Sequence, residues 1–212
     1  MRTGTSIDWV DWSDSEEFGI VMLKVDHIVN SIFNSITWIL SDSDCDHVWL
    51  VDCGDVVPVL ELIGEREVVG VLLTHAHFDH IYGLPELLKR FPNCKIYTNE
   101  SGRETLANAK KNMSFYHEMP VTVEESYTTI CDGGDSITLF QNTIANVYAT
   151  PGHHPSCLTF MVDDCLFTGD AFIPGVKVVT YLPQGNKMQA QESLEKIRKF
   201  AFEKIVCSGH NI

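Results

Sequence analysis

The chain has 212 residues, of which 44% are hydrophobic and 21% are charged, and its formal net charge is −14 at pH 7. A chain of this length and composition can bury a full hydrophobic core, and we expect a single domain over residues 1–212. Only 15 lysines and arginines stand against 29 acidic residues, which excludes the basic surface that binds nucleic acid. We therefore expect a small-molecule substrate and no nucleic-acid partner.

The seven cysteines form no C-x-x-C pair, and an odd number cannot close into a complete intramolecular disulfide set. The acidic N-terminal segment lacks the basic start and apolar stretch of a secretory signal. Both features predict a cytoplasmic protein. No apolar stretch approaches the roughly 18 residues of a membrane span, so we expect no membrane partner, and nothing in the sequence predicts the oligomeric state.

The first half of the chain alternates strand-like and helix-like segments. Segments rich in β-branched and aromatic residues predict strands over 20–25, 30–40, 47–52, 68–74 and 94–98. Apolar periodicity and capping signals predict helices over 56–65, 80–91 and 101–111. The polar SDSDCD segment predicts the turn of a hairpin, and Ser101 with Glu104 forms a capping signal for the third helix.

The second half repeats this pattern more loosely. Strands are predicted over 137–140, 142–150, 157–162, 165–170 and 204–209. An amphipathic helix is predicted over 188–200. The stretches 111–130 and 171–187 are candidate loops, and either could border a functional site.

Four of these strands end in the same way, with a potential metal ligand directly after the last hydrophobic residues. The segments are VVGVLLTHAHFDH, NVYATPGHHPS, CLFTGDA and KIVCSGHNI. Functional groups of layered α/β proteins collect beyond the strand ends at one edge of the sheet. We therefore expect one site that contains His75, His77, Asp79, His80, His153, Asp170 and His210.

The spacing of these residues suits two metal ions. His75 and His77 are two residues apart, so an extended segment directs both imidazoles to one side, where they can bind one ion. Asp79 and His80 are adjacent and must diverge, which suits a second ion. Seven ligands are too many for one tetrahedral ion and about right for two, with Asp170 as the bridge. Two zinc ions ~3.5 to 4 Å apart would lower the pKa of a bridging water towards ~7, which predicts hydrolysis at a carbonyl or phosphoryl centre.

The motifs VDCGD, THAHFDH, TPGHHPS, FTGDA and SGHN occur in this order from about residue 20 to the end of the chain. Together they resemble the metallo-β-lactamase superfamily. The resemblance implies an α/β fold, the four-layer αββα sandwich, with the metals at one edge of the two sheets. It implies a first metal on His75, His77 and His153, a second on Asp79, His80 and His210, and Asp170 as bridge. Asp52 and Gly54 match the family's DxG turn, which supports the site.

Branches of the superfamily differ at particular positions. The diiron flavoproteins carry Glu where His77 stands, and the β-lactamases of the main subclass carry Cys where Asp170 stands, so both activities are disfavoured.

The motifs are nearest to hydroxyacylglutathione hydrolases. These enzymes, however, have Thr and Gly where this chain has His154 and Ser156. They also carry a C-terminal helical substrate domain beyond the point where this chain ends. Both differences disfavour glutathione binding. Acyl-homoserine lactonases place a Tyr just after the bridging Asp, whereas Phe172 stands nearby here. The tRNA 3′-processing endonucleases share a segment like HIYGLPELL, but the acidic composition opposes RNA binding.

These observations predict a zinc-dependent hydrolase in which a metal-bridging hydroxide attacks an ester, thioester or lactone. Asp79 is the candidate catalytic residue, because it can orient the hydroxide and pass its proton to the leaving group. Iron or manganese could replace zinc. Two alternatives stay open: an oxygenase with one iron, like the persulfide dioxygenases of the superfamily, and a metal-holding binding module without catalysis.

Several other side chains near these motifs have roles that the sequence does not decide. We expect His154 to support the site rather than to bind metal. Trp9 and Trp12 either cover a sheet edge or form a lid over the metals. The cations that could hold an anionic substrate, with solvated surface positions as the alternative, are Arg103, Lys177 and Lys187.

Overall fold

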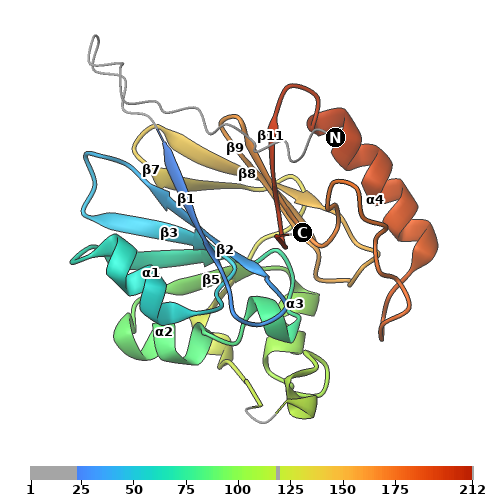
Figure 1. Ribbon diagram of the computed structural model, residues 1–212, viewed down its shortest axis with the longest axis horizontal. Helices are drawn as coiled ribbons and strands as arrows, with labels where there is room; N and C mark the ends of the chain where they lie inside the picture. The colour runs from blue at the N-terminus through green and yellow to red at the C-terminus, as the bar shows by residue number, and fades with distance from the viewer. Residues whose placement is uncertain (1–22, 118–119, 212) are drawn as a thin grey trace, which may run out of the picture.

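The computed structural model describes residues 23–117 and 120–211, in which two β-sheets pack face to face between two layers of helices (Figure 1). The first sheet has the strand order β1 (Lys24–Val29), β2 (Ile36–Ser41), β3 (His47–Val51), β4 (Glu67–Leu72), β5 (Lys95–Thr98) and β6 (Thr128–Ile130). The second sheet has the strand order β11 (Ile205–Ser208), β10 (Cys165–Gly169), β9 (Leu158–Val162), β8 (Thr143–Ala149) and β7 (Ser136–Phe140).

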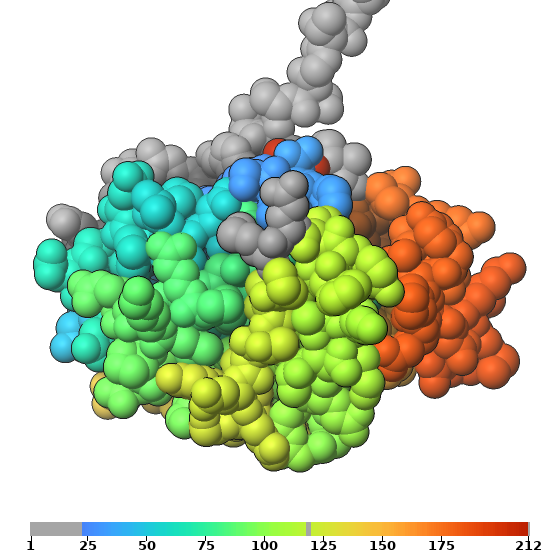
Figure 2. Space-filling model, turned by 90° about the horizontal axis from the view of Figure 1, so that it is seen from below, coloured from blue at the N-terminus to red at the C-terminus, as the bar shows by residue number. Residues whose placement is uncertain are grey.

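The helices lie on the outer faces of the two sheets. They are α1 (Val56–Ile63), α2 (Leu84–Arg90), α3 (Glu100–Leu106) and α4 (Lys187–Phe200). The first three lie along the first sheet and α4 lies on the second sheet (Figure 1). Seen from below, the cyan, green and yellow-green segments of the first three helices and their loops form one side of the surface, and the orange-red α4 lies beside them (Figure 2). The four-layer αββα sandwich that the resemblance implied is therefore confirmed.

Three separate hydrophobic clusters between the layers explain this arrangement. Successive residues of a strand point to opposite faces of its sheet. In β3, Leu50 joins the cluster beneath α1 and α2, whereas Val51 joins the cluster between the two sheets. In β10, Phe167 joins this central cluster, whereas Leu166 packs with Ile197 of α4 in the third. Strands that are apolar on both faces thus require a layer on each side.

The strand directions bring four carboxyl ends to one edge of the sandwich. In the first sheet, β3, β4, β5 and β6 are parallel. In the second sheet, β10 is parallel to β11 and antiparallel to β9, which is antiparallel to β8. It follows that β8, β10 and β11 all run in one direction. The residues that follow these three strands lie next to those that follow β4.

The strand predictions for the N-terminal region need two corrections. Residues 20–22 lie outside the described residues, and the strand predicted there runs over Lys24–Val29. The strand predicted over 30–40 begins only at Ile36. Residues 30–35 form a turn instead, in which Phe33 and Asn34 adopt left-handed φ values of 55° and 54°. The antiparallel hairpin of β2 and β3 across the SDSDCD turn is confirmed.

The helix and loop predictions between residues 80 and 130 also need correction. The helix predicted over 80–91 is an α-helix only over Leu84–Arg90, and a short 3-10 turn, Phe78–His80, precedes it. Helix α3 begins at Glu100 rather than Ser101, because the side chain of Asn99 caps it by accepting the backbone N–H of Gly102. The predicted loop over 111–130 contains the 3-10 turns Ser114–Tyr116 and Glu125–Tyr127 and ends in the edge strand β6. Among the described residues, no helix is long and apolar enough to cross a membrane.

Candidate metal centre

The structure brings the seven predicted metal ligands together where the carboxyl ends of β4, β8, β10 and β11 meet. The segment after β4 supplies four of them, and the segments after β8, β10 and β11 supply one each. The seven are His75, His77, Asp79, His80, His153, Asp170 and His210. Their donor atoms form three overlapping groups, and within each group all three atoms lie within 4.8 Å of one another. The third of these groups, which links the first two, consists of His75, His80 and Asp170.

The first group consists of His75, His77 and His153, all of which are buried. Nδ1 of His77 lies 2.9 Å from Nε2 of His153. Nε2 of His75 is buried and has no hydrogen-bond partner among the described residues. Three imidazole nitrogens therefore face one another in a closed environment, which is the donor set of an ion with three histidine ligands.

The second group consists of Asp79, His80 and His210. Nε2 of His80 lies 3.3 Å from Nε2 of His210, and Oδ2 of Asp79 lies 3.4 and 3.3 Å from these two nitrogens. Asp170 adjoins both groups, because its Oδ1 lies 3.2 Å from Nε2 of His210 and its Oδ2 lies 3.6 Å from Nε2 of His153. The Asp170 carboxylate therefore occupies the position between the groups that a bridging ligand requires.

Two backbone carbonyls orient the imidazoles of His153 and His210. Nδ1 of His153 donates to the carbonyl of Val179 at 2.8 Å, and Nδ1 of His210 donates to the carbonyl of Phe33 at 2.9 Å. A carbonyl can only accept, so in each neutral ring the proton is on Nδ1 and Nε2 carries the lone pair. Although His210 is close to the end of the chain, it is firmly held, because Gly209 accepts the backbone N–H of Ile36 at 2.8 Å.

Asp52 orients two further imidazoles through a single carboxylate. It accepts hydrogen bonds from Nδ1 of His80 at 2.8 Å, from the Thr74 hydroxyl at 2.7 Å and from the Thr74 backbone N–H at 2.8 Å. Since the Thr74 hydroxyl donates to Asp52, it accepts from Nδ1 of His75, 3.2 Å away. Asp52 is buried with a left-handed φ of 60°, a strained conformation that persists only when its surroundings over-determine it.

We expect Asp52→Asn to weaken metal binding at the second group by about 10- to 100-fold, the usual cost of removing a residue that supports a metal ligand. An amide nitrogen facing Nδ1 of His80 would push the ring proton onto Nε2 and block the ligand atom. A metal titration with a competing chelator measures the change. Asp42→Asn is the matched control, because Asp42 is also buried but its side chain accepts, among the residues that the structure describes, only the Asp44 backbone N–H at the opposite edge of the sheet. Equal affinities for Asp52→Asn and wild type would contradict the role of Asp52.

Burial and neighbouring imidazoles keep His75 and His77 of the first group neutral. Burial, with repulsion from the charge of His80, holds the pKa of His75 well below its ordinary value. Burial, with repulsion from His153 and His154, lowers the pKa of His77 to about 3. Neutral imidazoles need lose no proton before they bind a metal ion.

The second group is charged when no metal is bound. Burial opposes ionisation of its side chains, but the Asp79, Asp170 and Asp52 carboxylates raise the pKa of His80 well above its ordinary value. Against burial, hydrogen bonds to Asp170 and Asp79 raise the pKa of His210 to about 10. For both Asp79 and Asp170, burial is outweighed by the charge of His80 and by hydrogen bonds from His210 and His80, which hold each pKa well below its usual range. A metal ion bound here would have to displace the protons of two imidazoles.

Two glycines permit the close approach of these elements. A Cβ atom on Gly209 would lie 2.5 Å from Oδ1 of Asp170 and 2.9 Å from Cε1 of His80. Gly169 has a φ of 50°, and a Cβ there would lie 2.3 Å from the Thr74 hydroxyl oxygen. The glycines of the FTGDA and SGHN motifs are therefore required by space, and at Gly169 also by backbone conformation.

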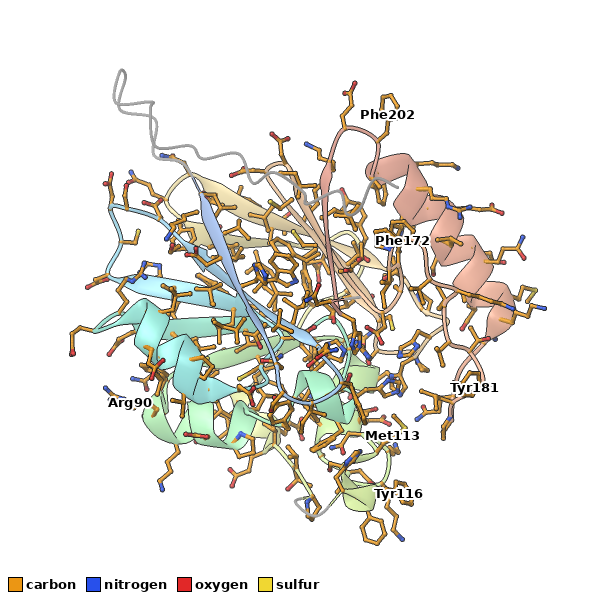
Figure 3. The ribbon with its side chains drawn as sticks, in the orientation of Figure 1. Arg90, Met113, Tyr116, Phe172, Tyr181 and Phe202 are labelled. Carbon is orange, nitrogen blue, oxygen red and sulfur yellow. The ribbon has the colours of Figure 1, made fainter. Side chains whose placement is uncertain are left out.

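A cavity of about 30 Å³ adjoins the cluster beside His153 and Asp170. The loop between β10 and α4 forms its other wall with Ile173, Val176, Lys177, Val178 and Val179. Of the two candidate loops, the one over 171–187 therefore lies beside the cluster. Tyr181 of the same loop is exposed and lies at the outer side of the molecule (Figure 3).

The three candidate cations for anion binding have different surroundings. Lys177 lines the cavity. Arg103 instead forms ion pairs with Glu100 and Glu125, and Lys187 is an exposed residue at the start of α4. Among the described residues, only Lys177 of the three is placed to meet a substrate beside the cluster. Trp9 and Trp12 lie outside the described residues.

Some supporting residues carried no recognisable signal in the sequence. Val179 and Phe33 act through backbone carbonyls, which any residue could supply, so side-chain patterns could not reveal them. Thr74 was detectable in principle, since it is the residue before the first histidine of the THAHFDH motif. His154 is buried next to the cluster without belonging to any of the three donor groups.

The chemistry of the cluster fits a metal site. Imidazole nitrogens lie 2.9 and 3.3 Å apart in two pairs, close enough for both members of each pair to bind one ion. A buried nitrogen without a partner, such as Nε2 of His75, costs free energy. A metal ion would satisfy these atoms, and imidazole and carboxylate ligands suit zinc, iron and manganese.

Residues 33–210 match the profile of the metallo-beta-lactamase superfamily, and the chain belongs to this superfamily. The chain is 30% identical over 175 residues to the hydroxyacylglutathione hydrolase of Enterobacter sp. (strain 638) and 32% identical over 179 residues to that of Xylella fastidiosa (strain 9a5c). These alignments cover 82% and 84% of this chain but only 60% of each relative. The chain thus spans about three-fifths of the length of these curated relatives.

The fold is also similar to known crystal structures. The structure of BLEG-1 B3 metallo-beta-lactamase aligns with a TM-score of 0.80 and 23% identity, over 89% of this chain and 92% of that chain. The structure of ETHE1 from Myxococcus xanthus aligns with a TM-score of 0.68 and 23% identity, over 89% of this chain and 76% of that chain. These similarities establish the fold.

Proposed function

We propose that the chain is a metal-dependent hydrolase that holds two zinc ions and cleaves an ester, thioester or lactone bond of a small molecule. The observation that carries this proposal is the pair of donor groups at one sheet edge, with the Asp170 carboxylate between them. The first ion would be held by His75, His77 and His153, the second by Asp79, His80 and His210, and Asp170 would serve both.

The side chains around the ions have separate tasks. Two zinc ions, when bound, supply a water of lowered pKa as the nucleophile and positive charge that stabilises the developing oxyanion. Hydrogen bonds to Asp52, Thr74, Val179 and Phe33 hold four of the five imidazoles in fixed orientations, so little reorganisation is needed during the reaction. Oδ2 of Asp79 lies 3.4 Å from Nε2 of His80 and 3.3 Å from Nε2 of His210, beside the position of the second ion. From there its carboxylate would accept a proton from the attacking water and return it to the leaving group.

The surroundings of the cluster support a substrate with both apolar and anionic parts. The cavity wall beside His153 is lined by Ile173 and three valines, with Lys177 among them. The similar relatives from Enterobacter and Xylella are named hydroxyacylglutathione hydrolases, which supports a thioester as the bond that is cleaved. Since this chain covers only 60% of their length, glutathione itself is one of several thiols to be tested.

Elemental analysis and a substrate panel test the proposal together. Protein purified without added metal should contain two zinc ions per chain and should hydrolyse a thioester, an ester or a lactone faster than phosphodiesters and β-lactams. One iron per chain, with oxygen consumed in the presence of a persulfide, would replace this function by that of a single-iron oxygenase. Two bound ions without turnover of any panel member would leave a metal-holding binding module.

A further inference from the structure

A second histidine follows His153, and it is fully buried although no donor group includes it. Nδ1 of His154 lies 2.7 Å from Oγ of Ser156 and accepts the backbone N–H of Ser156 at 3.1 Å. Nε2 of His154 is buried and has no hydrogen-bond partner among residues 23–117 and 120–211. A buried polar atom that is left unpaired is uncommon enough to require a reason.

The hydrogen bonds around Ser156 allow only one arrangement of protons. The backbone N–H of Ser156 is a donor, so Nδ1 of His154 is the acceptor and Nε2 carries the proton of the ring. The Ser156 hydroxyl oxygen accepts the backbone N–H of Ala76 at 3.1 Å. Its own proton is then directed to Nδ1 of His154, 2.7 Å away. A directed chain of hydrogen bonds runs from Ala76 through Ser156 to His154.

The first hydrogen bond of this series is donated by the residue that lies between two ligands of the first group. Ala76 separates His75 from His77, so holding its N–H fixes the extended backbone that directs both imidazoles to one side. The ring of His154 also contacts the ring of His77, with the centroids 4.9 Å apart and the planes at 67°. Ser156 and His154 therefore constrain the same segment, one through its backbone and the other through a side chain.

The segment that contains Ser156 is itself held in place. The backbone N–H of Leu158 donates to the carbonyl of Thr74 at 2.8 Å, which ties the start of β9 to the end of β4. The side chain of Asn99, the cap of α3, donates to the carbonyl of Pro155 at 3.2 Å. A firm element of the second sheet thus holds the ligand-bearing segment of the first sheet.

We propose that His154 and Ser156 are positioning residues for the first metal ion, because they hold His75 and His77 in the arrangement in which both bind it together with His153. The inference rests on the metal binding in the proposed function and does not depend on hydrolysis. It gives the buried pair a role that is distinct from the ligand role of the seven donors.

Cobalt titration of the metal-free, full-length chain tests this role. Co²⁺ takes the place of Zn²⁺, and its visible absorption reports the geometry of the ligands. We expect Ser156→Ala to weaken binding of Co²⁺ at the first site by about 10- to 100-fold, as for other residues that support metal ligands, and to change the absorption spectrum. Ser156→Thr keeps the hydroxyl and should restore both. His154→Asn, whose Oδ1 can accept in place of Nδ1, should bind Co²⁺ more tightly than His154→Leu.

Thr159→Val is the matched control, because it removes a buried hydroxyl that bonds to Thr150 at 2.9 Å within the same sheet. This variant should lower the midpoint of thermal unfolding to a similar extent as Ser156→Ala but should bind Co²⁺ as wild type does. Unchanged Co²⁺ affinity in Ser156→Ala, or an equal loss in Thr159→Val, would overturn the proposal. A wild-type protein that binds Co²⁺ but hydrolyses no substrate would refute the proposed function alone, whereas one that binds no Co²⁺ would refute both.

Discussion

Asp170→Ala protein should lose bound metal and hydrolytic activity together, with activity falling by more than about 100-fold. The loss should exceed the 10- to 100-fold cost of removing a residue that merely supports a ligand. Asp170 has a carboxylate that adjoins both groups, 3.2 Å from Nε2 of His210 and 3.6 Å from Nε2 of His153. Without it, neither of the two proposed ions would keep its full set of ligands. Metal analysis after gel filtration and steady-state rates on the best substrate of the panel measure the two losses.

Asp164→Ala is the matched control for this experiment. Asp164 lies directly before β10, whereas Asp170 lies directly after it. The exposed carboxylate of Asp164 forms an ion pair with Lys204 at 2.6 Å. An exposed ion pair contributes little to stability, so this variant should keep its metal and its activity. Full turnover by a metal-free Asp170→Ala protein would end the hypothesis of metal-dependent hydrolysis.

The layered fold could be predicted because the sequence pattern and the layers have the same physical origin. Strands such as β3 and β10 are apolar at successive positions, and only a sheet covered on both faces buries both sets of side chains. The site could be predicted for a related reason. The predicted ligands lie in segments that follow apolar strands, and strands that run in one direction deliver these segments to one edge.

The parts that could not be predicted depend on backbone conformation and on contacts between distant segments. Residues 30–35 have a strand-like composition, yet Phe33 and Asn34 turn with positive φ values. This turn places the carbonyl of Phe33 against His210, which is 177 residues away in sequence. The spacing of Ser101 to Glu104 fits a capping box and predicts Ser101 as the cap of α3, whereas Asn99, two residues earlier, competes for the same role and caps the helix.

The metal-free protein should have its highest free energy of unfolding near pH 6.5. This free energy should fall at both lower and higher pH. The folded-state pKa values of His80 and His210 are raised, that of His210 to about 10. Their contribution to stability is fully present below the unfolded-state pKa of about 6.5 and is lost as the pH rises through the raised folded-state pKa values. His75 and His77 have lowered pKa values, about 3 for His77. In the unfolded chain they take up protons that the folded chain cannot bind, so stability falls as the pH drops below about 6.5. Below about pH 3.9, the ordinary value for an aspartate, the contributions of Asp79 and Asp170 are lost as well, because their pKa values are lowered.

Bound metal should abolish the loss of stability above pH 6.5. An ion at the second group replaces the protons of His80 and His210, so its affinity rises with pH, and tighter binding to the folded state raises the free energy of unfolding. Urea unfolding at pH 6.5, 7.5 and 8.5 should therefore show a loss of roughly 1 to 2 kcal/mol per pH unit for the metal-free chain, of which His80 contributes about 1 and the partly exposed, solvent-screened His210 contributes less. The zinc-loaded chain should show no such loss. His210→Gln should make the metal-free profile shallower above pH 6.5, since it removes one of the two titrating imidazoles. A metal-free protein that becomes more stable between pH 6.5 and 8.5 would show that the second group is not the ion-paired cluster described here.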